Sequence, residues 1–113
     1  KANINKLPFK KNIVKDFRIG YNCMVNDYDT VDEVKNWIKE HKIKNHLFIF
    51  SAGSLSNFLC HQLYEFEDNN TYIDIGSSLN PFMGFPLDRR YLRQYWVNSN
   101  EPIMDIQKIC EWV

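Results

Sequence analysis

The apolar run Leu47–Phe50 is followed directly by four small residues, Ser51–Ser54. The run has the length of a strand, and its continuous apolar character is typical of a strand covered on both faces, as in a parallel sheet. Apolar residues then recur at helical spacing from about Leu55 to Glu65, which predicts a helix. Thr71–Ile75 forms the next expected strand. This order of elements predicts a βαβ unit.

Two segments before this unit also carry regular patterns. Thr30 and Glu33 have the spacing of a capping box, and apolar residues then recur at helical spacing to about His41. This pattern predicts an amphipathic helix. The segment Phe17–Val25 is rich in apolar and aromatic residues that partly alternate, which predicts a strand.

Glycine and proline dominate the segment Ser77–Pro86, and they exclude a long regular element there. We expect a long functional loop in its place. A short helix over Arg89–Trp96 should follow. Pro102 would stand in the first turn of a last helix that ends at about Trp112.

Together these elements predict an α/β fold, a Rossmann-like three-layer fragment with a small, mainly parallel sheet flanked by helices. We expect residues 1–113 to form a single α/β domain with residues 1–16 as an extended or flexible lead-in. A chain of 113 residues that opens on Lys1 is short for an enzyme that holds two substrates. We therefore expect a fragment whose N-terminal part, in the same protein, is missing.

Charge and cysteine content exclude several classes of function. Basic and acidic residues number 14 each, so no overall field attracts nucleic acid or an anionic membrane. The three cysteines are widely spaced, which fits neither a disulfide framework nor a CxxC metal site, and a cytoplasmic location is the simplest expectation. No apolar stretch has the length of a transmembrane segment.

The first candidate site is the turn after Phe50. Gly53 would let the backbone approach a ligand, and the unpaired amides of Ser54, Leu55 and Ser56 would point from a helix N-terminus toward a phosphate. The hydroxyls of Ser51 and Ser54 would add hydrogen bonds. One glycine is not the full dinucleotide-binding pattern, so a tight turn with a serine cap is the alternative.

The second candidate site is the end of the strand Thr71–Ile75. Asp74 lies about 20 residues after Gly53, the interval at which nucleotide-binding folds place an acid against ribose hydroxyls. Alternatively, Asp74 caps a neighbouring turn or pairs with Arg89 or Arg90. Gly76, Ser77 and Ser78 offer amides and hydroxyls that suit a sugar or phosphate.

Charged residues elsewhere suggest two further roles. Arg89 and Arg90 are able to clamp a pyrophosphate and stabilise a leaving nucleoside diphosphate, and a solvated helix face is the alternative. Asp27 and Asp29 match the DxD pattern that holds a divalent metal beside a diphosphate. Acids before a helix also stabilise its dipole without any ligand, so these two residues have a structural interpretation as well.

Three stretches resemble the C-terminal half of GT-D-type glycosyltransferases: Phe48–Asn57, Asn70–Pro81 and Arg89–Leu92. In that family a strand ends in a small-residue turn before a helix, and the next strand ends in D-I-G, which is Asp74-Ile75-Gly76 here. The resemblance covers residues 45–95 and implies a Rossmann-like fold that transfers a sugar, often from a UDP-linked donor, with a metal held by a D-x-E motif.

The chain departs from that family at three points. Ser54 replaces the usual proline, Ser77 stands where many members have histidine, and no D-x-E motif occurs. Carried over by the resemblance, Gly53 and Ser54 line the donor site, and Asp74, Gly76 and Ser77 contact the donor or its metal-bound diphosphate. The missing motif is expected upstream of Lys1.

The function expected from these patterns is that of a hexosyltransferase-type domain that binds a nucleotide sugar and a glycan acceptor, with Mn or Mg accompanying the donor, and is inactive as an isolated fragment. Asp74 and Arg89 are the candidates for a catalytic role. The predicted substrate-binding residues are Ser51, Gly53, Ser54, Asp74, Gly76, Ser77, Ser78, Arg89, Arg90 and Tyr91.

Two alternatives remain open. Tyr72–Ser77 also resembles the acidic strand end that holds S-adenosylmethionine in methyltransferases, although Ser78 stands where that loop carries a second glycine. A non-catalytic interaction module, in which the polar turns are only caps, is the other.

Overall fold

The computed structural model describes residues 3–85 and 89–90. The described residues divide into two compact units, one containing residues 3–10, 77–85 and 89–90 and the other residues 11–76. Most of the described helices and both strands belong to the second unit.

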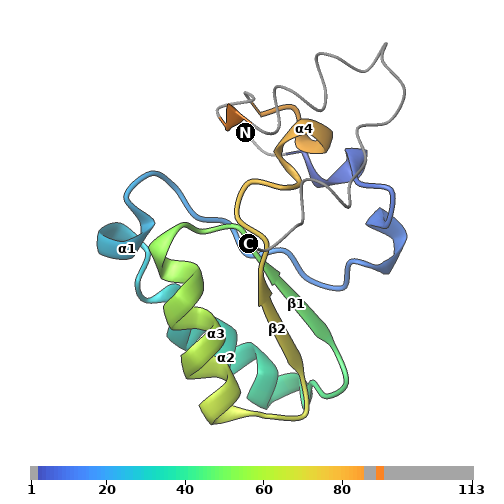
Figure 1. The fold of residues 1–113 in the computed structure, drawn as a ribbon. Coiled ribbons are helices and arrows are strands. Elements are labelled where there is room, and N and C mark those ends of the chain that lie inside the picture. Colours follow the sequence, from blue (N-terminus) through green and yellow to red (C-terminus); the bar gives the residue numbers. More distant parts are fainter. Residues whose placement is uncertain (1–2, 86–88, 91–113) are drawn as a thin grey trace, which may run out of the picture. The chain divides into compact units, whose positions relative to one another are not determined.

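The second unit is mixed α/β, with a two-stranded parallel sheet flanked by helices (Figure 1), which confirms the predicted fold class. Strand β1 (Leu47–Phe50) leads into helix α3 (Ser54–Phe66), which returns to strand β2 (Thr71–Asp74). The register pairs Leu47 with Thr71 and Phe50 with Asp74. The predicted βαβ unit is therefore confirmed.

Helix α2 (Thr30–His41) has the bounds that its periodicity predicts. Val31, Val34 and Ile38 are buried on one face. The predicted capping box, however, is wrong. Asp29 occupies the N-cap position and makes no side-chain capping bond. Thr30 is already inside the helix and is buried. The helix ends at His41, and the left-handed backbone of the C-cap residue Lys42 (φ 50°) turns the chain toward β1.

The core lies between the two long helices and one face of the sheet. Trp37 on α2 contacts Phe48 on β1 edge-on, with ring centroids 6.2 Å apart. Burial of apolar side chains of this size stabilises a fold by about 1.5–3 kcal/mol each. The buried cluster consists of Val31, Val34, Ile38, Ile43, Phe48, Ala52, Leu55, Leu59 and Leu63.

The two faces of the sheet differ in burial. Phe48 is 9% exposed and packs against the helices, with Tyr72 against the same cluster. On the opposite face Leu47 is 58% exposed and Ile49 and Ile73 are each 38% exposed. Because side chains alternate along a strand, two helices on one side cover only every second residue. The prediction that Leu47–Phe50 is covered on both faces is therefore wrong for the described residues.

The segment Phe17–Val25 is not a strand. It runs without regular structure to a turn and then forms the one-turn helix α1 (Cys23–Asn26). Asn22 is left-handed (φ 55°), and the Asp27 carboxylate accepts a hydrogen bond from the Gly20 amide at 3.0 Å. Local bonds from short polar side chains compete with extended pairing, and here they replace it.

The first unit contains short elements in its described part. The 3-10 helix η1 (Ile4–Lys6) lies beside α4 (Asn80–Met83), and the Asn3 amide donates to the Met83 carbonyl at 3.4 Å. A second 3-10 helix, η2 (Lys10–Asn12), follows along the chain. Gly84, with φ 78°, ends α4 after four residues. The segment expected to be a long loop therefore contains one short helix, and no long regular element forms in its described part.

The predicted helix over Pro102–Trp112 lies outside the described residues, as does that over Arg89–Trp96 beyond Arg90. Among the helices that are described, none has both the length and the apolar character needed to span a bilayer.

Candidate functional site

The carboxyl ends of the two strands lie side by side. The Ile75 amide donates to the Phe50 carbonyl at 3.0 Å, which extends the pairing one residue beyond the strands. The Ser51 hydroxyl then donates to the Gly76 carbonyl. The two strand ends singled out in the sequence therefore meet at one edge of the sheet, as the parallel arrangement predicts.

The turn between β1 and α3 has a backbone that requires glycine. Gly53 has φ 53° and ψ −133°, a region that side-chain-bearing residues rarely adopt. The Leu55 and Ser56 amides donate to the Ala52 and Gly53 carbonyls, both at 3.1 Å. The prediction that these two amides are unpaired is wrong, because the chain enters the helix through a tight hydrogen-bonded turn.

Ser56 was missed as a structural residue by sequence reasoning. It is fully buried, and its hydroxyl oxygen accepts from the Ala52 amide at 2.9 Å. It is this serine, and not the exposed Ser54, that serves the turn. Ser54 is left at the surface, at the first position of α3.

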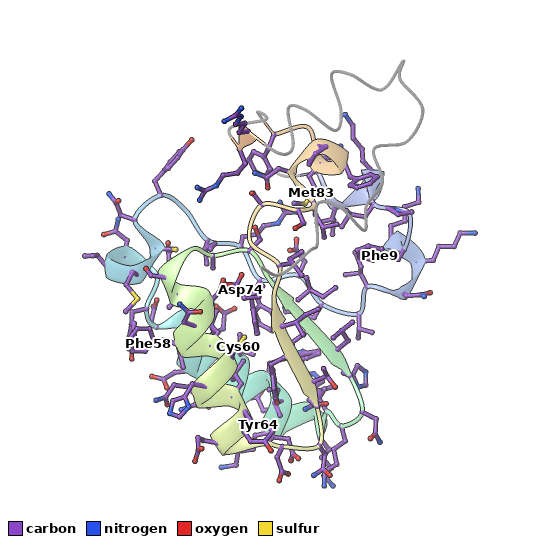
Figure 2. All side chains as sticks on the ribbon, in the orientation of Figure 1. Phe9, Phe58, Cys60, Tyr64, Asp74 and Met83 are labelled. Atoms are coloured by element: carbon purple, nitrogen blue, oxygen red, sulfur yellow. The ribbon has the colours of Figure 1, made fainter. Side chains whose placement is uncertain are left out.

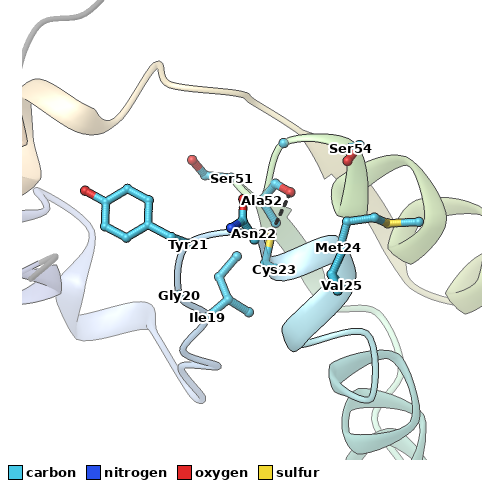
Figure 3. A pocket seen from close by; sticks show the side chains of 11 residues that line it. Ile19, Gly20, Tyr21, Asn22, Cys23, Met24, Val25, Ser51, Ala52 and Ser54 are labelled. Carbon is cyan, nitrogen blue, oxygen red and sulfur yellow. Dashed lines mark hydrogen bonds between the residues drawn. The ribbon is translucent and has the colours of Figure 1, made fainter.

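A pocket of about 400 Å³ opens beside this turn (Figure 3). One wall is Ser51–Ser54 and the other is Ile19–Val25. The Cys23 thiol donates to the Ala52 carbonyl at 3.2 Å and so connects the two walls. The second wall was not anticipated, because its apolar residues suggested a strand; the turn-forming residues Gly20 and Asn22 were the available signal.

The pocket lining carries no Lys, Arg, Asp or Glu side chain among the described residues. Its polar side chains are the hydroxyls of Ser51, Ser54 and Tyr21 and the carboxamide of Asn22, with the Cys23 thiol beside them. A ligand in this pocket is therefore bound by hydrogen bonds, by the dipole of α3 and by apolar contact.

Asp74 lies at the end of β2 and is exposed (Figure 2). Its Oδ1 accepts from the Gly76 amide at 2.9 Å, so it caps the following turn, which is one of the alternatives that the sequence leaves open. Burial raises the pKa of the Cys60 thiol on α3, and the negative charge of Asp74 raises that pKa further. Asp74 is not among the residues that line the pocket.

Asp27 and Asp29 have structural roles. The Asp27 carboxylate accepts from the Gly20 amide, as described above. Asp29 is the N-cap of α2, and its own carbonyl accepts from the Glu33 amide at 3.0 Å. Within the part of the chain that the structure describes, no three His, Cys, Asp or Glu side chains gather where they would hold a metal. A bound Mn or Mg stays a prediction.

The remaining candidates belong to the first unit. The Ser77 carbonyl accepts from the Asn80 amide at 3.0 Å at the start of α4, and Ser78 is exposed beside it. Arg89 and Arg90 are exposed. Tyr91 lies outside the described residues.

The chain matches no protein-family model, no curated protein and no solved structure. Function is therefore inferred from the residues and the geometry of the pocket.

Proposed function

We propose that the chain is a glycosyltransferase domain that binds a UDP-linked sugar for transfer to a glycan acceptor. The observation that carries this proposal is the pocket at the carboxyl end of β1, where Rossmann-like folds hold nucleotides. One of its two walls is Ser51–Ser54, which belongs to a stretch that resembles GT-D-type glycosyltransferases.

The groups around the turn suit the diphosphate of such a donor. Gly53 has no side chain, and a Cβ placed there would meet nothing within 4 Å, so the backbone is open to a ligand. The first turn of the 13-residue helix α3 carries the positive end of its dipole, which favours an anion. The Ser54 hydroxyl stands at this position and supplies a hydrogen-bond donor.

In the proposed reaction, the acceptor hydroxyl forms a bond to the anomeric carbon of the sugar as the bond from that carbon to the diphosphate oxygen breaks. The proton of the hydroxyl leaves to a base, and UDP departs with the negative charge. The helix dipole and Ser54 would stabilise that charge as it develops on the leaving group. A Mn or Mg ion bound with the donor would add further stabilisation.

The proposal is tested by isothermal titration of the chain with UDP and UDP-glucose, with and without Mn. Replacing Ser54 by Ala removes one donor and should weaken binding about 2- to 10-fold, from about 0.5–1.5 kcal/mol for a hydrogen bond. Asp74→Asn should weaken it about 10- to 150-fold if the carboxylate accepts from ribose, from about 1.5–3 kcal/mol for a charged partner. Both variants should unfold at about the wild-type urea concentration, because both side chains are exposed and asparagine keeps an oxygen that accepts from the Gly76 amide.

Asp68→Asn serves as the control, since Asp68 is an exposed acid in the turn at the other end of the sheet. Unchanged affinity in Asp74→Asn would remove Asp74 from the site. Binding of S-adenosylmethionine instead of UDP would assign the pocket to a methyltransferase. A chain that binds neither ligand but forms a stable complex with another subunit would be an interaction module.

A further inference from the structure

Tyr21 is the most exposed large hydrophobic residue described in the second unit, with 97% of its surface accessible. Phe58, another exposed aromatic residue of this unit, contacts Tyr28, with ring centroids 6.0 Å apart. Within residues 3–85 and 89–90, no aromatic ring pairs with that of Tyr21. The ring is thus presented to solvent without packing.

The backbone that carries this ring is fixed on both sides. The Gly20 amide donates to Asp27 at 3.0 Å, and the Asn26 carboxamide donates to the Tyr21 carbonyl at 3.3 Å. The Asn22 carbonyl accepts from the Val25 amide at 2.9 Å and so starts α1. Because this backbone is already anchored, only the side-chain torsions of Tyr21 have to be ordered when a ligand contacts the ring.

Tyr21 also stands at one side of the pocket. Figure 3 shows Tyr21 and Ser54 on opposite sides, with Ser51 between them. An elongated ligand that places its diphosphate by Ser54 therefore extends past Ser51 toward the Tyr21 ring. Because the lining carries no ionic side chain, contact with a flat ligand group contributes a large share of the available binding free energy.

We infer that Tyr21 is the stacking platform for the base of the nucleotide donor, so that the pocket recognises a nucleoside diphosphate through both its base and its diphosphate. This inference rests on the proposed function, and it adds the recognition of the base. Stacking of a base on an aromatic side chain is worth about 1–3 kcal/mol, which corresponds to about a 5- to 150-fold change in affinity.

The test compares two ligands, UDP and ribose 5-diphosphate, which lacks the base, in isothermal titrations of wild type and three variants. Tyr21→Ala should bind UDP about 5- to 150-fold more weakly and ribose 5-diphosphate as wild type does. Tyr21→Phe keeps the ring and should retain UDP binding. Tyr64→Ala is the matched control, since Tyr64 is 56% exposed on α3 and does not line the pocket.

Each other outcome overturns the inference in a distinct way. If Tyr21→Ala binds UDP as tightly as wild type, Tyr21 has no role while the proposed function stands. If both ligands are weakened equally, Tyr21 shapes the pocket and does not stack on the base. If wild type binds no UDP at all, the proposed function and this inference fail together.

Discussion

The two ends of the sheet use polar residues in opposite ways. At the amino end, Asn70 is 6% exposed; its Oδ1 accepts from the His46 amide at 3.0 Å and its Nδ2 donates to the Ile43 carbonyl at 2.9 Å. At the carboxyl end, Gly53 and Ser54 are exposed beside the pocket. One end closes the fold, and the other presents groups to solvent.

A polar turn before or after a strand therefore does not by itself mark a functional site. Asn70 belongs to a turn that looks unremarkable in the sequence, yet it joins the chain before β1 to the start of β2. Ser54 and Ser56 are two residues apart, but only Ser56 is buried and bonded to the turn. A polar group that has a hydrogen-bond partner within the fold is structural, whereas one without such a partner is open to a ligand. Whether a partner is present depends on the three-dimensional contacts.

The largest change in stability is expected when the Asn70 side chain is removed. Asn70→Ala leaves the partly buried His46 amide and the buried Ile43 carbonyl without this partner, and an unsatisfied buried group costs about 1–3 kcal/mol. We expect the free energy of unfolding to fall by about 2–4 kcal/mol, measured by urea denaturation. Asn69→Ala is the matched control and should cost less than about 0.5 kcal/mol, since Asn69 is exposed. If the two variants were equally stable, the Asn70 hydrogen bonds would not stabilise the amino end of the sheet.

A smaller effect is expected from Gly53→Ala at the carboxyl end. A Cβ meets no atom within 4 Å, so the cost is that of the backbone conformation alone, about 1–3 kcal/mol. Thermal unfolding should show this loss. Gly20→Ala, whose Cβ would approach only the Asp27 carboxylate at 3.8 Å, should be nearly neutral. A neutral Gly53→Ala would mean that the turn relaxes freely and is not preorganised for a ligand.

The smallest effect concerns the Cys60 thiol. Its pKa is raised first by burial and then by Asp74, so the thiolate is scarce at neutral pH and forms only as the pH rises through the folded-state pKa. Asp74→Asn removes the charge and should lower that pKa, so alkylation by iodoacetamide at pH 8.5 should become faster by a small factor. Site-resolved mass spectrometry follows Cys60 separately, and Cys23 should react at its wild-type rate. No acceleration would show that burial alone sets the pKa.

Much of the second unit is predictable from the sequence, because its elements have clear periods. Thr30–His41 and Ser54–Phe66 carry apolar residues at helical spacing, and Leu47–Phe50 is a short apolar run. The strand predicted over Phe17–Val25 is wrong. Asp27 and Asn26 make hydrogen bonds to the nearby backbone, and these bonds hold the segment in a turn in spite of its alternating pattern. Such bonds depend on where the side chains lie after folding, and the periodicity of apolar residues carries no information about this.

The candidate site is predictable in part for the same reason. The turn Ser51–Ser54 follows from strand length and small residues, and the pairing of Ser51 with Gly76 follows from parallel topology. The wall that carries Tyr21 does not follow, because it comes from a segment distant in sequence. Asp74 illustrates the remaining ambiguity: its spacing suggests a ribose ligand, and its observed bond to the Gly76 amide is a cap.

Within residues 3–85 and 89–90, the face of the sheet opposite α2 and α3 has exposed apolar side chains. Leu47, Ile49 and Ile73 form an apolar row on a two-stranded sheet, and such rows promote association between molecules in concentrated solution. Threonine keeps the β-branched shape that strands favour while it adds a hydroxyl. Ile49 and Ile73 are therefore the positions where solubility can be engineered without touching the pocket wall.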